Sequence, residues 1–141
     1  MNNRIVQNAG TNLAGAVGLF AGADGYDVSG NDVCGNFSLE YGAGVSVYGL
    51  SPNGKIHDNR IYYNEAVDSG AGLTISEETP QGAVLGDGSG RVDIDRNIIQ
   101  SNYSGDDGGA IFVMNAQAQR INIRTNFIVA NGAADIGGAV Q

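Results

Sequence analysis

Two aspartates, Asp93 and Asp95, stand two residues apart in the short segment RVDID, and Lys55 and His57 hold the matching places one repeat earlier. Alternate residues of a strand point to the same side, so these carboxylates would project together, roughly 6.6 to 7 Å apart. That separation suits an inverting glycosidase, with Lys55 or His57 as a further acid or base. A surface ladder of alternating charges is the other interpretation, and we favour it because opposite charges recur down the stacked positions.

A second group of acidic residues follows the repeated motif described below at a fixed distance, and one more acid stands beside it. Carboxylate oxygens are the ligands that Ca²⁺ prefers, so the group is a candidate calcium site. Alternatively, each carboxylate accepts hydrogen bonds from the Gly-rich turn that follows it. We favour the turn interpretation because the repeats lack the nonapeptide of calcium-loaded β-rolls. The candidate ligands are Asp68, Asp106, Asp107 and Asp135.

One repeat is longer than the others, and its excess is an acidic, Gly-rich segment over 76–90 that contains Glu77 and Glu78. Insertions in repeat proteins often carry a binding surface, although a tolerated surface loop is an equal alternative. Aromatic side chains at outward positions could stack on sugar rings, or could pack against their neighbours instead. These aromatic residues are Tyr48, Tyr62, Tyr63 and Phe112.

The framework that must position these groups is a repeat with the pattern Asn-x-[Ile/Val]-x-x-Asn. Its first Asn recurs after 28, 28, 38 and 29 residues, and such periods are typical of solenoids. The copies are NRIVQN (3–8), NDVCGN (31–36), NRIYYN (59–64), NIIQSN (97–102) and NFIVAN (126–131).

Apolar residues around each motif are spaced by two, which predicts short strands with one buried face. About three strands fit into each repeat, and no window has the spacing of a long helix. Five rungs of three strands, stacked on one another, describe an all-β parallel β-helix that forms one elongated domain over 1–141. Parallel crossovers are almost always right-handed, so we expect that hand. Leucine is too scarce for a leucine-rich repeat.

Stacking also explains the paired asparagines, because an amide can donate to one neighbouring rung and accept from the other. We expect these side chains to form ladders, and the first Asn of each motif to adopt the left-handed backbone of a tight corner. The ladder residues are Asn31, Asn36, Asn59, Asn64, Asn97, Asn102, Asn126 and Asn131.

Two stretches, NRIYYN followed by SGAGLTI and NIIQSN followed by GGAIFV, resemble the repeats of bacterial surface members of the right-handed parallel β-helix superfamily. That superfamily includes pectate-lyase-like enzymes and polymorphic outer-membrane proteins, and the resemblance covers nearly the whole chain. It implies a secreted or cell-surface bacterial protein. The expected function is a rigid, adhesin-like module whose lateral surface contacts polysaccharide or a surface protein. The alternative is a fragment of a polysaccharide lyase, hydrolase or epimerase.

The amino-acid composition limits the classes of molecule that the chain is expected to bind. The chain has 23 Gly, only 16% charged residues and a formal net charge of −8, which argues against nucleic acid and anionic membranes. No apolar run is long enough to insert into a membrane, and the single Cys34 excludes an internal disulfide. Calcium is the one cofactor that the residues suggest.

The two ends of the sequence lack the atypical capping repeats that solenoids usually carry. We therefore expect a segment of a longer protein. In isolation we expect it to associate end to end with other copies, because an uncovered rung exposes strand edges and core.

Overall fold

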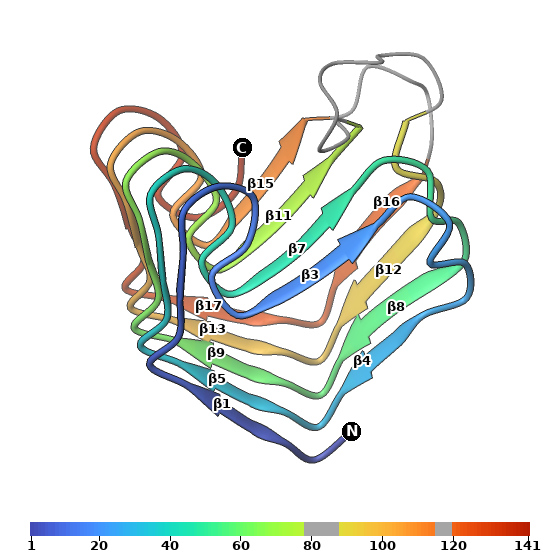
Figure 1. Ribbon diagram of the computed structural model, residues 1–141. Helices are drawn as coiled ribbons and strands as arrows, with labels where there is room; N and C mark the ends of the chain where they lie inside the picture. The colour runs from blue at the N-terminus through green and yellow to red at the C-terminus, as the bar shows by residue number, and fades with distance from the viewer. Residues whose placement is uncertain (78–87, 115–119) are drawn as a thin grey trace.

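The computed structural model describes residues 1–77, 88–114 and 120–141, and all regular elements in these ranges are β-strands. The chain coils around one axis, and equivalent strands of successive coils stack into parallel sheets (Figure 1). Among the described residues no helix is long and apolar enough to cross a membrane. This arrangement confirms the predicted parallel β-helix.

Three of the four sheets contain the strands expected from the spacing of apolar residues. The motif sheet consists of β1 (Arg4–Val6), β5 (Asp32–Cys34), β9 (Arg60–Tyr62), β13 (Ile98–Gln100) and β17 (Phe127–Val129). The next consists of β3 (Val17–Phe20), β7 (Val45–Tyr48), β11 (Leu73–Ser76) and β15 (Ile111–Met114). The third, called the charged sheet below, consists of β4 (Asp27–Ser29), β8 (Gly54–His57), β12 (Val92–Asp95) and β16 (Ile121–Arg124).

A fourth sheet was not expected, and its strands are only two residues long. Such a strand has no apolar periodicity to read, so the sequence pattern around the second Asn gives no sign of it. Its members are β2 (Ala9–Gly10), β6 (Phe37–Ser38), β10 (Glu65–Ala66), β14 (Tyr103–Ser104) and β18 (Gly132–Ala133).

The strands pair in the register that the motif predicts, so identical positions of successive repeats lie one above another. In the motif sheet, for example, Ile61 pairs with Val33 on one side and Ile99 on the other. All three side chains are completely buried and belong to one continuous hydrophobic core. The long repeat keeps this register as well, because Ile94 pairs with Ile56 across it. The core is therefore a set of stacked columns of Val and Ile.

Asparagine ladders run beside these columns and confirm the prediction. In each motif copy that has a successor, the backbone N–H and the side-chain amide of Asn donate to the Asn Oδ1 of the next repeat. All of these distances lie between 2.9 and 3.1 Å. In every ladder residue from Asn36 onward, the side-chain amide also donates to a backbone carbonyl of the preceding repeat. The buried amides are thus satisfied by neighbouring rungs.

The prediction that the first Asn takes the left-handed backbone is wrong. At the corner before the motif sheet, positive φ falls on the preceding residue: Asp58, Arg96 and Thr125 have φ values of 55°, 53° and 57°. Gly30 holds the same place with a φ of 65°. The Asn itself lies beyond the turn, where its backbone N–H can reach the amide oxygen of the next rung. The ladder, rather than the corner, explains why Asn recurs.

Candidate functional site

The outer face of the charged sheet brings together the four residues predicted for chemistry. Two columns of side chains run across its strands, and the register places them side by side. The first column is Asp27, Lys55, Asp93 and Asn122. The second is Ser29, His57, Asp95 and Arg124. Between them lies a hollow of about 280 Å³, the charged hollow, lined by Lys55, His57, Asp93, Asp95, Arg96 and Arg124.

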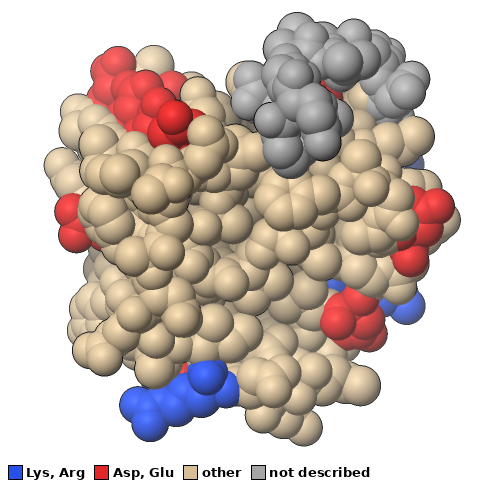
Figure 2. All heavy atoms as spheres, viewed as in Figure 1, with Lys and Arg blue, Asp and Glu red and all other residues tan. Residues whose placement is uncertain are grey.

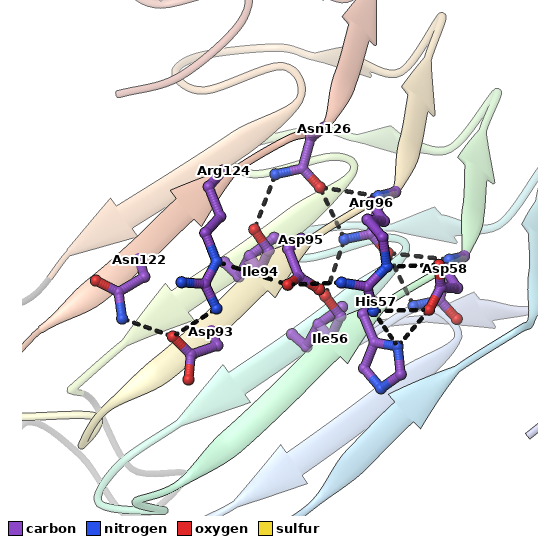
Figure 3. A network of polar contacts seen from close by, with 12 residues as sticks. Ile56, His57, Asp58, Asp93, Ile94, Asp95, Arg96, Asn122, Arg124 and Asn126 are labelled. Atoms are coloured by element: carbon purple, nitrogen blue, oxygen red, sulfur yellow. Dashed lines mark hydrogen bonds and ion pairs between the residues drawn. The ribbon is translucent and has the colours of Figure 1, made fainter.

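Both oxygens of Asp93 have partners. Its Oδ1 accepts a hydrogen bond of 2.6 Å from Asn122 Nδ2 (Figure 3). Its Oδ2 accepts one of 3.1 Å from Arg91 Nη2. These contacts lower the pKa of Asp93, with the hydrogen bond from Asn122 as the largest cause and the charges of Arg91 and Arg124 adding to it. Asp93 is therefore ionised at neutral pH.

Arg96 joins Asp95 to the corner that follows β8. Its Nη1 donates to Asp95 Oδ2 at 2.9 Å, while its Nε and Nη2 each lie 3.0 Å from one oxygen of Asp58. This two-point contact is the favoured geometry between a guanidinium and a carboxylate. Hydrogen bonds from Arg96, and next from His57, lower the pKa of Asp58 to about 2. Arg96 is thus a permanent cation held between two carboxylates (Figure 3).

His57 lies between the carboxylate of the next residue, Asp58, and that of Asp27 on the neighbouring strand. Its Nδ1 is 2.6 Å from Asp58 Oδ2, and its Nε2 is 3.3 Å from Asp27 Oδ1 on β4. The hydrogen bond with Asp58 is the largest cause that raises the pKa of His57, and Asp27 acts in the same direction against the opposing effect of burial. The imidazole is therefore easier to protonate than in water.

Two cations of the hollow have side-chain N–H groups that make no short hydrogen bond within the described residues. Lys55 is exposed and makes no ion pair with any residue in the described ranges. The side chain of Arg124 is 59% exposed and approaches Asp93 and Asp95 only at 3.8 and 3.6 Å. These distances exceed those of a charge-assisted hydrogen bond. Both groups can reach a molecule that enters the hollow.

The fold also brings together three of the four candidate calcium ligands, in the turns after β14 and β18, and Asp68 is not part of this cluster. Ligand oxygens of Asp106, Asp107 and Asp135 lie within 4.8 Å of one another, and Figure 2 shows acidic side chains gathered at the corner formed by the C-terminal turns. Asp107 accepts 3.1 Å hydrogen bonds from the backbone of Ile136 and from Gln141 Nε2. These carboxylates could hold a cation, but Asp107 already makes the kind of backbone contact that the turn interpretation predicts.

We expect Asp106→Asn to raise the melting temperature at pH 7 in the presence of a chelator. The charge of Asp107 is the largest cause of a raised pKa at Asp106, followed by burial and then by Asp68 and Asp135. An acid whose folded pKa is raised favours folding while protonated, and that contribution disappears as pH rises through the folded pKa. The amide removes the repulsion at pH 7 and should give no gain at pH 3. Calorimetry at both pH values checks this, and a lower melting temperature of the variant at pH 7 would contradict it.

The aromatic positions divide into two classes. Tyr48 is fully buried and stacks on Phe20 with a ring distance of 6.1 Å, so its expected role as an exposed platform is wrong. Tyr62 and Phe112 are half-buried, and Tyr62 packs against Tyr63. Only Tyr63 presents most of its side chain to solvent. Packing, the alternative use of these rings, applies to Tyr48 and Tyr62.

The two acids of the insertion give different outcomes. Glu77 is buried, and its backbone N–H donates to Met114 O at 3.1 Å, so it is not the exposed binding residue that we expected. It directly follows β11, in which all four residues are buried on both faces of the strand. Glu78 lies outside the described residues.

One contributor to the site recurs in only some of the rungs. Arg91 binds Asp93, and Arg120 holds the same place before β16, but Asn53 holds it before β8. The position of Arg91 two residues before Asp93, on the same side of the strand, is the clue that the sequence does contain.

Comparisons with known proteins leave the family of the chain open. No family model matches the sequence, and neither a curated protein nor a solved structure matches it.

Proposed function

We propose that the chain is a rigid binding module that presents the outer face of the charged sheet to a polysaccharide, at the surface location that the resemblance implies. The charged hollow is the observation that supports this proposal. Six ionisable side chains converge there from strands β8, β12 and β16 and the corner after β12. Polysaccharides are recognised by dense arrays of donors and acceptors, which these groups supply.

The framework behind the face favours a preformed site. Each strand of the charged sheet is hydrogen-bonded to its neighbours, and the adjoining corner is fixed by the ladder residues Asn59, Asn97 and Asn126. A rigid site loses little conformational entropy when a ligand binds.

The alternative, a hydrolase that uses Asp93 and Asp95, has less support. Such an enzyme needs one carboxyl group that is protonated at its working pH. The pKa of Asp93 is lowered by Asn122, Arg91 and Arg124, and burial opposes this only in part. Asp95 is paired with Arg96 at 2.9 Å. The lowered pKa of Asp93 disfavours it as the protonated acid, and Asp95 is already engaged in a contact with Arg96.

Affinity electrophoresis in gels that contain individual neutral or acidic polysaccharides tests the proposal. We expect at least one polysaccharide to retard the wild type, and Arg124→Ala to reverse most of that retardation. Arg60→Ala is the matched control, because Arg60 is an exposed arginine on the motif sheet with one long ion pair of 4.0 Å. An absence of retardation in all gels, or an equal loss for both variants, would overturn the assignment of this face.

A further inference from the structure

Positive charge is concentrated on one face of an acidic protein. The chain has seven Lys and Arg residues against 15 acids and a single His. Five of these seven, together with the His, lie on the charged sheet or in the segments that flank it. They are Lys55, His57, Arg91, Arg96, Arg120 and Arg124. Among the six residues that line the hollow, only Asp93 and Asp95 are acidic. With His57 neutral, the three cations of the lining exceed its two carboxylates by one, while the formal net charge of the chain is −8.

Within the hollow the carboxylate acceptors are hydrogen-bonded, whereas some of the N–H donors are not. Asp93 and Asp95 are engaged by Asn122 at 2.6 Å and by Arg96 at 2.9 Å. Lys55 carries three donors and makes no ion pair within the described part of the chain. Spare donors beside occupied acceptors are what a bound anion requires.

We infer that the charged hollow is a subsite for one carboxylate or sulfate group of an acidic saccharide, contacted by Lys55 and Arg124. The inference rests on the proposed function, since it names the chemical class of ligand for the same face. The hollow is close to the lower end of the size range of ligand pockets, so it suits one charged group with part of a sugar ring. The carboxylates of Asp93 and Asp95 lie beside Arg124, at 3.8 and 3.6 Å.

His57 makes the charge of this subsite depend on pH. Its ring faces Asp58 after its own strand, Asp27 on β4 and, at 3.3 Å, Arg96 Nη2 after β12. Asp95 is its partner in register on β12, and Lys55 stands two residues before it on β8. The two carboxylates that hold the ring favour its cationic form. Protonation adds a positive charge to the hollow, so anion affinity should rise as pH falls through the pKa of His57.

Isothermal titration calorimetry with the full chain tests the subsite at low salt and pH 7. The probes are a glucuronate-bearing oligosaccharide, the same oligosaccharide after reduction of its carboxyl groups, and a Glu-rich peptide of equal charge. We expect the acidic oligosaccharide to bind at least about tenfold more tightly than the reduced one, the effect of one hydrogen bond to a charged group. Lys55→Ala and Arg124→Ala should each remove about tenfold from the acidic probe alone.

Each contrary outcome has a distinct meaning. Equal affinity for the acidic and reduced oligosaccharides would overturn the anion subsite and leave polysaccharide binding in place. Binding of neither would overturn the subsite, while retardation by another polysaccharide would still support the proposed function. Tighter binding of the peptide would overturn the assignment to a saccharide. An equal loss in Arg60→Ala would mean that general charge, rather than the hollow, attracts the probe.

The pH dependence gives a second, independent readout. The affinity of the wild type for the acidic oligosaccharide should be higher at pH 5.5 than at pH 8, while the carboxylate of the probe stays ionised at both values. His57→Gln should bind equally at the two pH values. A dependence that persists in this variant would contradict the role of His57, and thermal melting of every variant verifies that it is folded.

Discussion

Asn64→Ala should lower the free energy of unfolding by about 2–5 kcal/mol. The Oδ1 of Asn64 accepts hydrogen bonds from the backbone N–H of Asn36 at 3.1 Å and from its side-chain amide at 2.9 Å. Both residues are about 1% exposed, so water cannot replace the lost acceptor without opening the corner. Each buried donor left unpaired costs about 1–3 kcal/mol. Urea denaturation followed by circular dichroism measures the change.

Asn8→Ala is the matched control for this variant. Asn8 stands in the same column as Asn64, is exposed, and its Oδ1 accepts no hydrogen bond from any residue in the described ranges. Its loss removes only side-chain donations and should cost less than about 1 kcal/mol, the typical net value of an ordinary hydrogen bond. Equal effects at the two positions would contradict a stabilising ladder.

Ile99→Ala should destabilise the protein by about 2–5 kcal/mol, the usual range for truncating a buried isoleucine. Ile99 is 0% exposed, and it pairs in register with Ile61 and Ile128. The residues around it belong to backbone ladders on both sides, so they cannot easily collapse into the space that the side chain leaves. The same urea experiment measures this loss.

The neighbouring residue provides a control of identical chemistry. Ile98 lies on the same strand, points to the other face and is 39% exposed. Ile98→Ala should cost less than about 1 kcal/mol, as for most surface substitutions. Equal effects at the two positions would contradict the assignment of Ile99 to the core and Ile98 to the outer face.

The coil and its ladders could be predicted because they depend on residues that recur in every rung. Val33, Ile61 and Ile99 keep one place in the motif, so their burial follows from a single alignment of the repeats. The fourth sheet was not predictable in this way, since a strand such as Glu65–Ala66 is shorter than any periodic pattern.

The corner before the motif sheet shows a different limit of prediction from sequence. Gly30, Asp58, Arg96 and Thr125 share the left-handed backbone although they have little in common as side chains. Only Gly and, less often, Asp favour that conformation locally, so Arg96 and Thr125 adopt it because the stacked rungs impose it. Our prediction considered the preferences of single residues, and it therefore placed the left-handed backbone on the Asn that follows this corner residue.

For the site, spacing predicted the face but could not predict the contacts. Asp93 and Asp95 share a side because a strand alternates, and Lys55 and His57 join them through register. Which oxygen Arg96 reaches depends on rotamers and on the corner geometry. The complete burial of Tyr48, which stacks on Phe20 in the neighbouring rung, likewise does not follow from spacing alone.

The asparagine ladders make the two ends of the coil inequivalent, because each Asn Oδ1 accepts hydrogen bonds from the preceding repeat. The oxygen of Asn64 serves the rung before it, while its own backbone N–H donates to Asn102 in the rung after it. Removing the Asn64 side chain therefore takes the acceptor from Asn36, whereas the Asn102 oxygen keeps one of its two donors. A defect should spread unevenly, with amide hydrogen exchange accelerated on the N-terminal side of the damaged rung and largely unchanged on the other.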